Sequence, residues 1–398
     1  MVEKRQQVDI PTSKNAPVVI MSRFKQPWSG LLAFSVPLLV SIITWWIFFD
    51  PRYHEDQFLI FLAPTVGGLG LIGVLWAIWF DNWPYYNKLR KAWQIVLVGT
   101  IINLAIMVIL AFVLRPIFTR FLAQKLGITD EIIADYVGKS IFGALSGSTF
   151  SFATLWVSAT MFWPFFKYDQ PKRGIFVWIV GTVITIITWV AGFLFTVDPT
   201  VTDIRYAIKD SYLDALGLTQ WTIFYSLLTL MVLEYWPWTK IAKKQPFVGI
   251  YAFFGCGILG FITYIGFKYV AKYAFSPIFI ALGGEPGFLI TVEKSWTTMN
   301  ISFADFLIAA VILVALFFDN WPKKYKQWKN FIIRVVLVLV IGIASFFLYY
   351  LVSPSLFGEP RNHFIKVPTH FLVYFLWLEL LFAYVWRKWP IYKEFKKG

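Results

Sequence analysis

The sequence has few of the side chains that carry most catalytic and metal-binding chemistry. Its 398 residues include one cysteine and three histidines, and only 15% of them are charged. The single cysteine, Cys256, excludes disulfides and thiol-ligated metal sites within the chain. His54, His363 and His370 do not have the i, i+4 spacing of a helical metal site. The P-loop, dinucleotide-binding and nucleophile-elbow motifs are also missing, so we expect neither an enzyme nor a bound metal or cofactor.

Apolar residues are abundant instead: 58% of the chain is hydrophobic, 20% is aromatic and the mean hydropathy is +0.65. They form ten blocks of roughly 15 to 25 residues, the length at which a helix crosses a hydrocarbon core of about 30 Å. The blocks cover residues 29–49, 58–80, 94–114, 142–162, 174–197, 219–233, 248–267, 301–318, 331–352 and 369–385. The sequence therefore predicts an all-α polytopic membrane protein with about ten transmembrane helices in a lipid bilayer.

The basic residues predict an orientation. If residues 1–28 are cytoplasmic, the segments on that side carry 23 lysines and arginines, and those on the other side carry 12. This asymmetry is the positive-inside bias, and an even number of spans returns the C-terminus to the same side. We expect a protein of the cell membrane with both termini in the cytoplasm. Loops beside anionic headgroups account for the net charge of +14, so we expect no nucleic-acid partner.

A Trp-Pro dipeptide ends every second block, at Trp83-Pro84, Trp163-Pro164, Trp236-Pro237, Trp321-Pro322 and Trp389-Pro390. Similar hexapeptides precede four of the other blocks: KQPWSG, QPKRGI, KQPFVG and KQWKNF, which begin at Lys25, Gln170, Lys244 and Lys326. These matches predict five tandem helical-hairpin repeats with both termini inside the cell. The repeats cover 29–84, 85–164, 165–237, 238–322 and 323–390, between an N-terminal tail (1–28) and a C-terminal tail (391–398).

The Trp-Pro dipeptide is suited to the end of a transmembrane helix. Proline cannot continue a helix, and tryptophan prefers the headgroup region, so the pair is an anchor and a stop signal. A charged residue stands two positions before the tryptophan in four repeats: Asp81, Glu234, Asp319 and Arg387. A carboxylate there opposes the helix dipole, so we expect basic partners nearby. An inner ring of salt bridges and a cytoplasmic gate are both consistent with this pattern.

Ionisable residues inside a membrane are costly and by default indicate function. Glu379 is the deepest, Asp305 lies near the outer end of its block, and Arg334 is close enough to the inner surface to reach the headgroups. We expect Glu379 to be a proton-coupled or cation-coupled carboxylate, or the counter-charge of a substrate. The alternative is a protonated glutamic acid that is hydrogen-bonded between helices.

Small, polar and aromatic residues inside the blocks complete the candidate substrate or ion site. The proline and glycines predict either an unwound or kinked segment or close helix packing. The hydroxyl residues lie at helical spacing and would face protein or a cavity, and the tryptophans would either bind an organic cation or fill hydrophobic space. These candidates are Pro64, Gly67, Gly68, Gly70, Ser151, Thr154, Ser158, Trp156, Trp189 and Trp377.

Two functions from different classes fit these observations. The first is a permease for a small-molecule solute, since polytopic architecture, internal repeats and sparse buried carboxylates recur in transporters. Cation coupling and an organic cation such as a methylated amine suit the carboxylates and the aromatic residues. The second is a non-transporting membrane subunit or scaffold, in which the repeats only provide packing.

Overall fold

The computed structural model describes residues 18–22, 24–53, 58–86, 88–89, 91–126, 129, 152, 154–196, 204–284, 293–359 and 370–396. Its α-helices are α1 (Trp28–Phe48), α2 (Phe58–Trp79), α3 (Ala92–Ile109), α4 (Arg115–Leu126), α6 (Thr154–Thr160), α7 (Lys172–Thr196), α8 (Ile204–Leu227), α9 (Trp238–Ile241), α10 (Phe247–Val270), α11 (Ser276–Ala281), α13 (Glu293–Ile312), α14 (Gln327–Leu356) and α16 (His370–Leu380). Five π-helical segments extend these helices in the described part: η1 (Leu110–Leu114), η4 (Leu228–Val232), η5 (Ala271–Phe275), η6 (Leu313–Phe317) and η7 (Leu381–Val385). A short 3-10 helix, η3, covers Phe165–Lys167.

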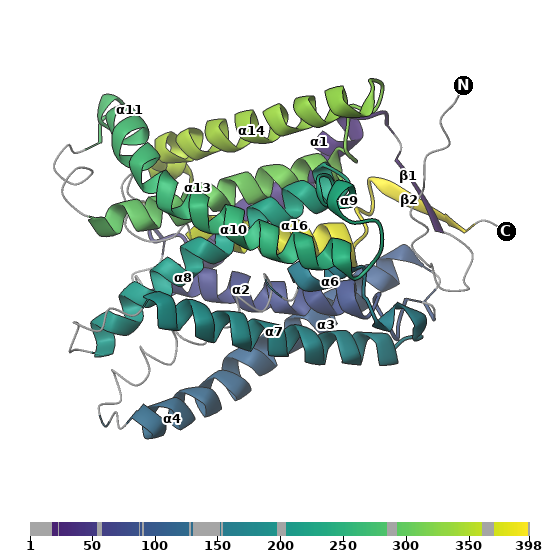
Figure 1. Cartoon of the computed structure of the whole chain (residues 1–398), viewed down its shortest axis with the longest axis horizontal. Coiled ribbons are helices and arrows are strands. Elements are labelled where there is room, and N and C mark those ends of the chain that lie inside the picture. Colours follow the sequence, from purple (N-terminus) through teal and green to yellow (C-terminus); the bar gives the residue numbers. More distant parts are fainter. Residues whose placement is uncertain are drawn as a thin grey trace.

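The long helices run side by side along the longest axis of the molecule (Figure 1). One strand from each tail, β1 (Val18–Ser22) and β2 (Tyr392–Lys396), pairs in an antiparallel ribbon that aligns Val18 with Lys396. The ribbon and α9 lie at one end of the bundle, and α4 and α11 lie at the other (Figure 1). The two tails therefore meet at the same end, although the sequence predicted no strand in either.

Five described helical stretches are long and apolar enough to cross a membrane, judged by length and composition: Trp28–Phe48, Ala92–Lys125, Phe247–Ala281, Thr298–Phe317 and Gln327–Leu356. Three shorter apolar helices, Val66–Trp79, Leu216–Val232 and Phe371–Val385, coincide with further predicted blocks. Several membrane-spanning helices are thus present, and the number ten stays a prediction.

The helices form two layers. Inner helices α2, α16, α13 and α8 contact one another in that order, α8 also contacts α6, and every described side chain on these five helices is buried or half-buried. Outer helices α1, α3, α7, α10 and α14 pack against them from outside. In the most apolar stretch of α13, 89% of the residues are buried, against 17 to 28% in α1, α3, α10 and α14. The outer helices therefore present the apolar faces that suit contact with lipid.

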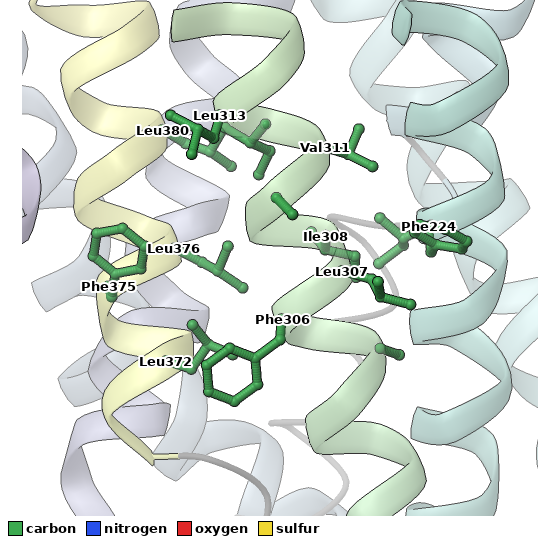
Figure 2. Packing of buried hydrophobic residues seen from close by; sticks show 14 of the residues in the cluster. Phe224, Phe306, Leu307, Ile308, Val311, Leu313, Leu372, Phe375, Leu376 and Leu380 are labelled. Atoms are coloured by element: carbon green, nitrogen blue, oxygen red, sulfur yellow. The ribbon is translucent and has the colours of Figure 1, made fainter. Parts of the chain in front are cut away.

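The centre of the bundle is filled by aliphatic and aromatic side chains. Figure 2 shows α13 between α8 and α16, with Phe306 and Leu307 of α13 directed toward these neighbours. Leu372 and Leu376 of α16 meet α13 from one side, and Phe224 of α8 meets it from the other (Figure 2). Because lipid is as apolar as these side chains, close van der Waals packing rather than burial from water stabilises such contacts in a membrane.

Candidate functional site

All five Trp-Pro dipeptides end inner helices with the same backbone turn. In each copy the Trp–Pro peptide is cis, and two residues with positive φ precede the tryptophan. The backbone N–H of each tryptophan donates to the backbone carbonyl three residues earlier, at 2.9 or 3.0 Å. These carbonyls belong to Phe80, Thr160, Leu233, Phe318 and Trp386. We call residues 81–84, 161–164, 234–237, 319–322 and 387–390 the Trp-Pro turns. Asp81, Glu234, Asp319 and Arg387 hold the first positive-φ position, a conformation that Asp and Asn adopt more readily than most residues.

Three glutamines attach outer helices to these turns. The side-chain Oε1 of each glutamine accepts a hydrogen bond from the glycine N–H four residues later, and its Nε2 donates to a backbone carbonyl of an inner helix. The sets are Gln26 with Gly30 and Phe317, Gln170 with Gly174 and Trp79, and Gln245 with Gly249 and Ala159, at 2.9 to 3.2 Å. The accepting carbonyl lies four residues before a Trp-Pro tryptophan in every case, so the three joints have the same geometry.

Arg334 makes the corresponding joint for α14. Its guanidinium donates to the carbonyl of Val232 at 3.2 Å, which also lies four residues before a Trp-Pro tryptophan, and to Glu234 Oε1 at 3.0 Å. It also donates to the carbonyl of Pro322 at 3.3 Å, and only 2% of its side chain is exposed. The expectation that Arg334 reaches the headgroups is therefore wrong, because carbonyls and a carboxylate at the end of η4 hold it inside the protein.

The second positive-φ residue of four turns links neighbouring inner helices. Its side chain donates to a backbone carbonyl of the neighbouring inner helix. That carbonyl lies five residues before the Trp-Pro tryptophan of the neighbouring helix, and we call these contacts the turn links. They are Asn82 to Tyr384 (3.3 Å), Lys388 to Leu316 (2.6 Å), Asn320 to Met231 (3.1 Å) and Tyr235 to Ser158 (2.6 Å). Burial raises the pKa of Tyr235 to about 12 and lowers that of Lys388. The links run from α2 through α16, α13 and α8 to α6.

The charged residues at the first positive-φ position all have partners of opposite charge. Glu234 pairs with Arg334, Asp319 with Lys323 at 2.9 Å, and Asp81 with Arg387 at 3.7 Å. These contacts supply the basic partners that the sequence predicted for carboxylates at helix C-termini.

Among the described residues, two buried carboxyl groups lie on inner helices, in addition to Asp50 and Glu359, which follow α1 and α14. Asp305 on α13 and Glu379 on α16 are both 0% exposed, and these two helices contact each other. None of their four carboxyl oxygens has a hydrogen-bond partner among the described residues. Buried polar groups normally have partners, and leaving them without one costs about 1 to 3 kcal/mol each. Arg334 joins the Trp-Pro end and is not placed beside either group.

The glycine-rich segment of α2 is helical, not unwound. The helix continues without a break from Phe58 to Trp79 and includes Pro64. The prediction of an unwound segment is therefore wrong. A Cβ atom on Gly67 would lie 2.7 to 2.8 Å from the Val373 backbone of α16, and one on Gly70 would overlap the Trp377 indole. A Cβ atom on Gly68 would meet nothing within 4 Å. Gly67 and Gly70 therefore allow close packing of α2 on α16, as small residues do in membranes.

The hydroxyl residues of α6 line a small cavity. Thr154 and Ser158 face Ser226 and Leu230 of α8 and η4 across a space of about 30 Å³, and Ser151 lies outside the described residues. Thr154 Oγ1 is buried and has no hydrogen-bond partner in the described part of the chain. A cavity of this size holds about two water molecules.

The tryptophans inside the helices are part of the packing. Trp377 donates from Nε1 to Asn103 Oδ1 at 2.9 Å and meets Tyr374 edge to face, with the ring centroids 5.6 Å apart. Trp156 meets Phe253 in the same way at 5.7 Å, and the side chain of Trp189 lies outside the described residues. Asn103 also donates to the carbonyl of Gly70 at 3.0 Å. Trp377 thus fills space and satisfies its N–H.

The sequence carries a signal for the glutamine joints, although by itself the signal indicates only repetition. The recurring QPxxG pattern holds both the glutamine and the glycine of each joint. The turn links had no such signal, because Asn82, Tyr235, Asn320 and Lys388 share a position but not a side-chain type.

The fold and the buried site together define a class: the chain is a helical, multi-pass membrane protein. No family model matches the chain, and neither curated proteins nor solved structures match it.

Proposed function

We propose that the protein is a permease that moves a small solute across the cell membrane by using a cation gradient. It consists of five helical hairpins, with ten spans, and has its Trp-Pro end and both tails in the cytoplasm. The recurring turn, the glutamine joints and the turn links support five equivalent units, since each feature occurs at the same distance from a Trp-Pro tryptophan. The pairing of β1 with β2 supports tails on one side.

The observation that carries the proposal is the pair of buried carboxyl groups. Measured from the Trp-Pro tryptophan, the position of Glu379 is occupied by Gly73, Ser226 and Val311 in three other units, so the repeat does not require an acid there. A carboxyl that is 0% exposed, without a hydrogen-bond partner among the described residues, is costly unless it binds something in the working cycle. A proton or a small cation is the species that a carboxylate binds, and a methylated ammonium solute fits the same charge.

Tight packing favours the alternative function, a non-transporting membrane subunit. The space of about 30 Å³ between α6 and α8 is far smaller than the pockets of about 300 Å³ or more that bind small molecules. In this conformation a permease would be closed, and its solute path would form only on opening.

The test uses purified protein in liposomes with an imposed proton gradient and a pH-sensitive dye inside. A panel of solutes is added, with tetramethylammonium, trimethylamine, glycerol and urea as probes. The wild type should admit protons only in the presence of a transported solute. Glu379→Gln, which keeps the shape and cannot titrate, should abolish this response, whereas Glu359→Gln at the end of α14 should retain it. A Glu379→Gln variant with the wild-type response would exclude Glu379 from coupling and leave the subunit hypothesis favoured.

Orientation has an independent test. Single cysteines in a Cys256→Ala background at Lys243, near the Trp-Pro end, and at Tyr53, near the opposite end, are exposed to an impermeant thiol reagent in whole cells. Tyr53→Cys should react and Lys243→Cys should react only after lysis. The reverse result would place the Trp-Pro end outside.

A further inference from the structure

We call the interface between two neighbouring inner helices a seam. The turn links leave one seam of the inner bundle without a link. Each link runs from a turn to the inner helix of the preceding unit, so the missing one would run from residue 162 to the carbonyl of Ile78. Residue 162 is Phe162, whose side chain has no hydrogen-bond donor. Its ring lies 5.4 Å from the Arg173 guanidinium of α7 instead. The seam between α2 and α6 therefore differs from the four linked seams through one side chain.

Buried polar groups without partners gather around this seam. Trp79 Nε1 on α2 and Arg173 Nε on α7 are buried and have no hydrogen-bond partner within the described ranges. Leu75 and Trp79 of α2 meet Val157 of α6 and Val177 of α7 in a small hydrophobic cluster separate from the main core. Such groups raise the free energy of the closed arrangement relative to one in which they are hydrated.

The other flank of α6 is also loosely packed. The cavity of about 30 Å³ separates Thr154 and Ser158 of α6 from Ser226 and Leu230. Atoms that line a void lose their dispersion contacts on that side, so moving the helix costs less there than in a filled interface. At the Trp-Pro end, the Tyr235 link to the Ser158 carbonyl and the packing of Leu155 and Ala159 near Leu230 join α6 to the helix formed by α8 and η4.

We propose that α6 is the movable inner helix and that the bundle opens at the Trp-Pro end through the seam between α2 and α6, with Phe162 in place of a locking side chain. This proposal specifies the entrance of the proposed permease and rests on that function. Separation of α2 from α6 hydrates Trp79 and Arg173 and breaks none of the four turn links. Every other seam must break one link to open.

The test measures opening without transport. Single cysteines replace Ile78, at the unlinked seam, and Met231, at a linked seam, in a Cys256→Ala background. Both side chains are half-buried, both lie five residues before a Trp-Pro tryptophan, and neither substitution removes the backbone carbonyl that accepts a link. The reaction rate with a soluble maleimide is then measured on purified protein in nanodiscs. Ile78→Cys should react several-fold faster than Met231→Cys.

Phe162→Tyr supplies the missing donor and copies the side chain of Tyr235. It should slow the labelling of Ile78→Cys about fivefold, as expected for one hydrogen bond, and leave Met231→Cys unchanged. Phe162→Asn, which copies Asn82 and Asn320, replaces it if the tyrosine variant does not fold. Conversely, Tyr235→Phe should accelerate the labelling of Ser158→Cys.

Equal labelling of Ile78→Cys and Met231→Cys, or no effect of a folded donor variant at Phe162, would overturn the proposal. The result is independent of the permease test. Faster labelling at Ile78 together with normal coupling in Glu379→Gln would retain the movable seam and reject the coupling role. Loss of coupling in Glu379→Gln with equal labelling would retain the permease and reject this entrance.

Discussion

The two ends of the bundle are closed by different chemistry. At the Trp-Pro end, one turn occurs five times, and side chains of several types bind backbone carbonyls at the same two distances from each tryptophan. At the opposite end, the described residues include a clamp that joins α1 to α14. Arg52 pairs with Asp50 at 2.5 Å and donates to the Ser355 carbonyl at 2.6 Å, while Trp45 donates to Phe357 at 3.0 Å.

The difference shows how a repeated sequence closes into one bundle. A repeated motif makes equivalent joints wherever equivalent units meet, and backbone carbonyls serve as acceptors whatever the local sequence is. At the opposite end, the contact between α1 and α14 is made by Asp50 and Arg52, charged residues that belong to neither the Trp-Pro nor the QPxxG pattern. We therefore expect substitutions to cost similar amounts across copies at the Trp-Pro end, and larger amounts at the clamp.

The largest effect is expected for Arg52→Met. The Asp50 side chain is 0% exposed, so removing the Arg52 side chain leaves a buried carboxylate without its counter-ion. The expected cost is about 3 kcal/mol, the low end for a buried pair, because 37% of the Arg52 side chain is exposed and the Arg52 backbone N–H still donates to Asp50. The measurement is the free energy of unfolding in detergent. The double variant Asp50→Asn/Arg52→Met removes the charge as well and should recover most of the loss. An equal loss in the single and double variants would show that packing, not charge, holds the clamp.

The clamp end should also be sensitive to pH. Burial raises the pKa of Glu359 to about 7 against an opposing hydrogen bond from Tyr349. The folded protein therefore keeps a proton that the unfolded chain loses above pH 4.5, so stability is full below that pH and falls as pH rises to about 7. The resulting decrease in the free energy of unfolding is about 3 kcal/mol at most. Glu359→Gln should flatten this slope in an unfolding titration, and a slope that is unchanged would assign the effect to other groups.

At the Trp-Pro end, Gln245→Leu should cost about 2 kcal/mol, because it removes two hydrogen bonds and leaves the Ala159 carbonyl without its donor. Gln170→Leu should cost the same within the error of the measurement. Gln26 is not part of this comparison, because its Nε2 also donates to the Tyr392 hydroxyl at 2.8 Å, and that hydroxyl is a second donor to the Phe317 carbonyl. Gln94→Leu is the control, since the described part of the chain shows no side-chain hydrogen bond for it. Very different losses at Gln170 and Gln245 would contradict equivalent joints.

Much of the Trp-Pro end could be predicted from the sequence, since the dipeptide and the QPxxG pattern mark the residues that form it. Which helix each joint reaches could not, because Gln26 finds its acceptor 291 residues away at Phe317. The two neighbouring glycines of α2 show the same limit. Gly67 touches the backbone of α16 and Gly68 touches nothing within 4 Å, a difference that depends on how one helix is rotated against another.

Arg334 shows why the candidate site was only partly predictable. Hydropathy and position suggested a side chain in the headgroups, but the long guanidinium found Val232, Glu234 and Pro322 inside the protein. Conversely, Glu379 was identified from depth alone, and the structure adds that it is fully buried on a helix beside the one that carries Asp305. The depth of a residue in the membrane can be predicted from its position along one helix. The contact partners of its side chain depend on how several helices pack.

The smallest effect is expected for the ion pair between Asp81 and Arg387. The charged groups lie 3.7 Å apart, and 57% of the Asp81 side chain is exposed, so solvent screens their attraction. A double-mutant cycle with Asp81→Asn and Arg387→Met should give a coupling energy below about 0.5 kcal/mol, which salt near 1 M reduces further. The Arg387→Met single variant should cost more than the coupling, because the guanidinium also lies 3.5 Å from the centre of the Tyr86 ring.

This cycle decides between the two interpretations of the charged ring at the Trp-Pro end. A small, salt-sensitive coupling energy would show that Asp81 and Arg387 form an ordinary surface ion pair. The contact between α2 and α16 would then depend on the Asn82 link, whose hydrogen bond is 3.3 Å long. A coupling above about 2 kcal/mol would require a desolvated pair, and would make this contact a latch between α2 and α16. In that case two contacts, the Asn82 link and the ion pair, would hold the seam between α2 and α16. The seam between α2 and α6, which has neither, would be still more clearly the weaker flank of α2.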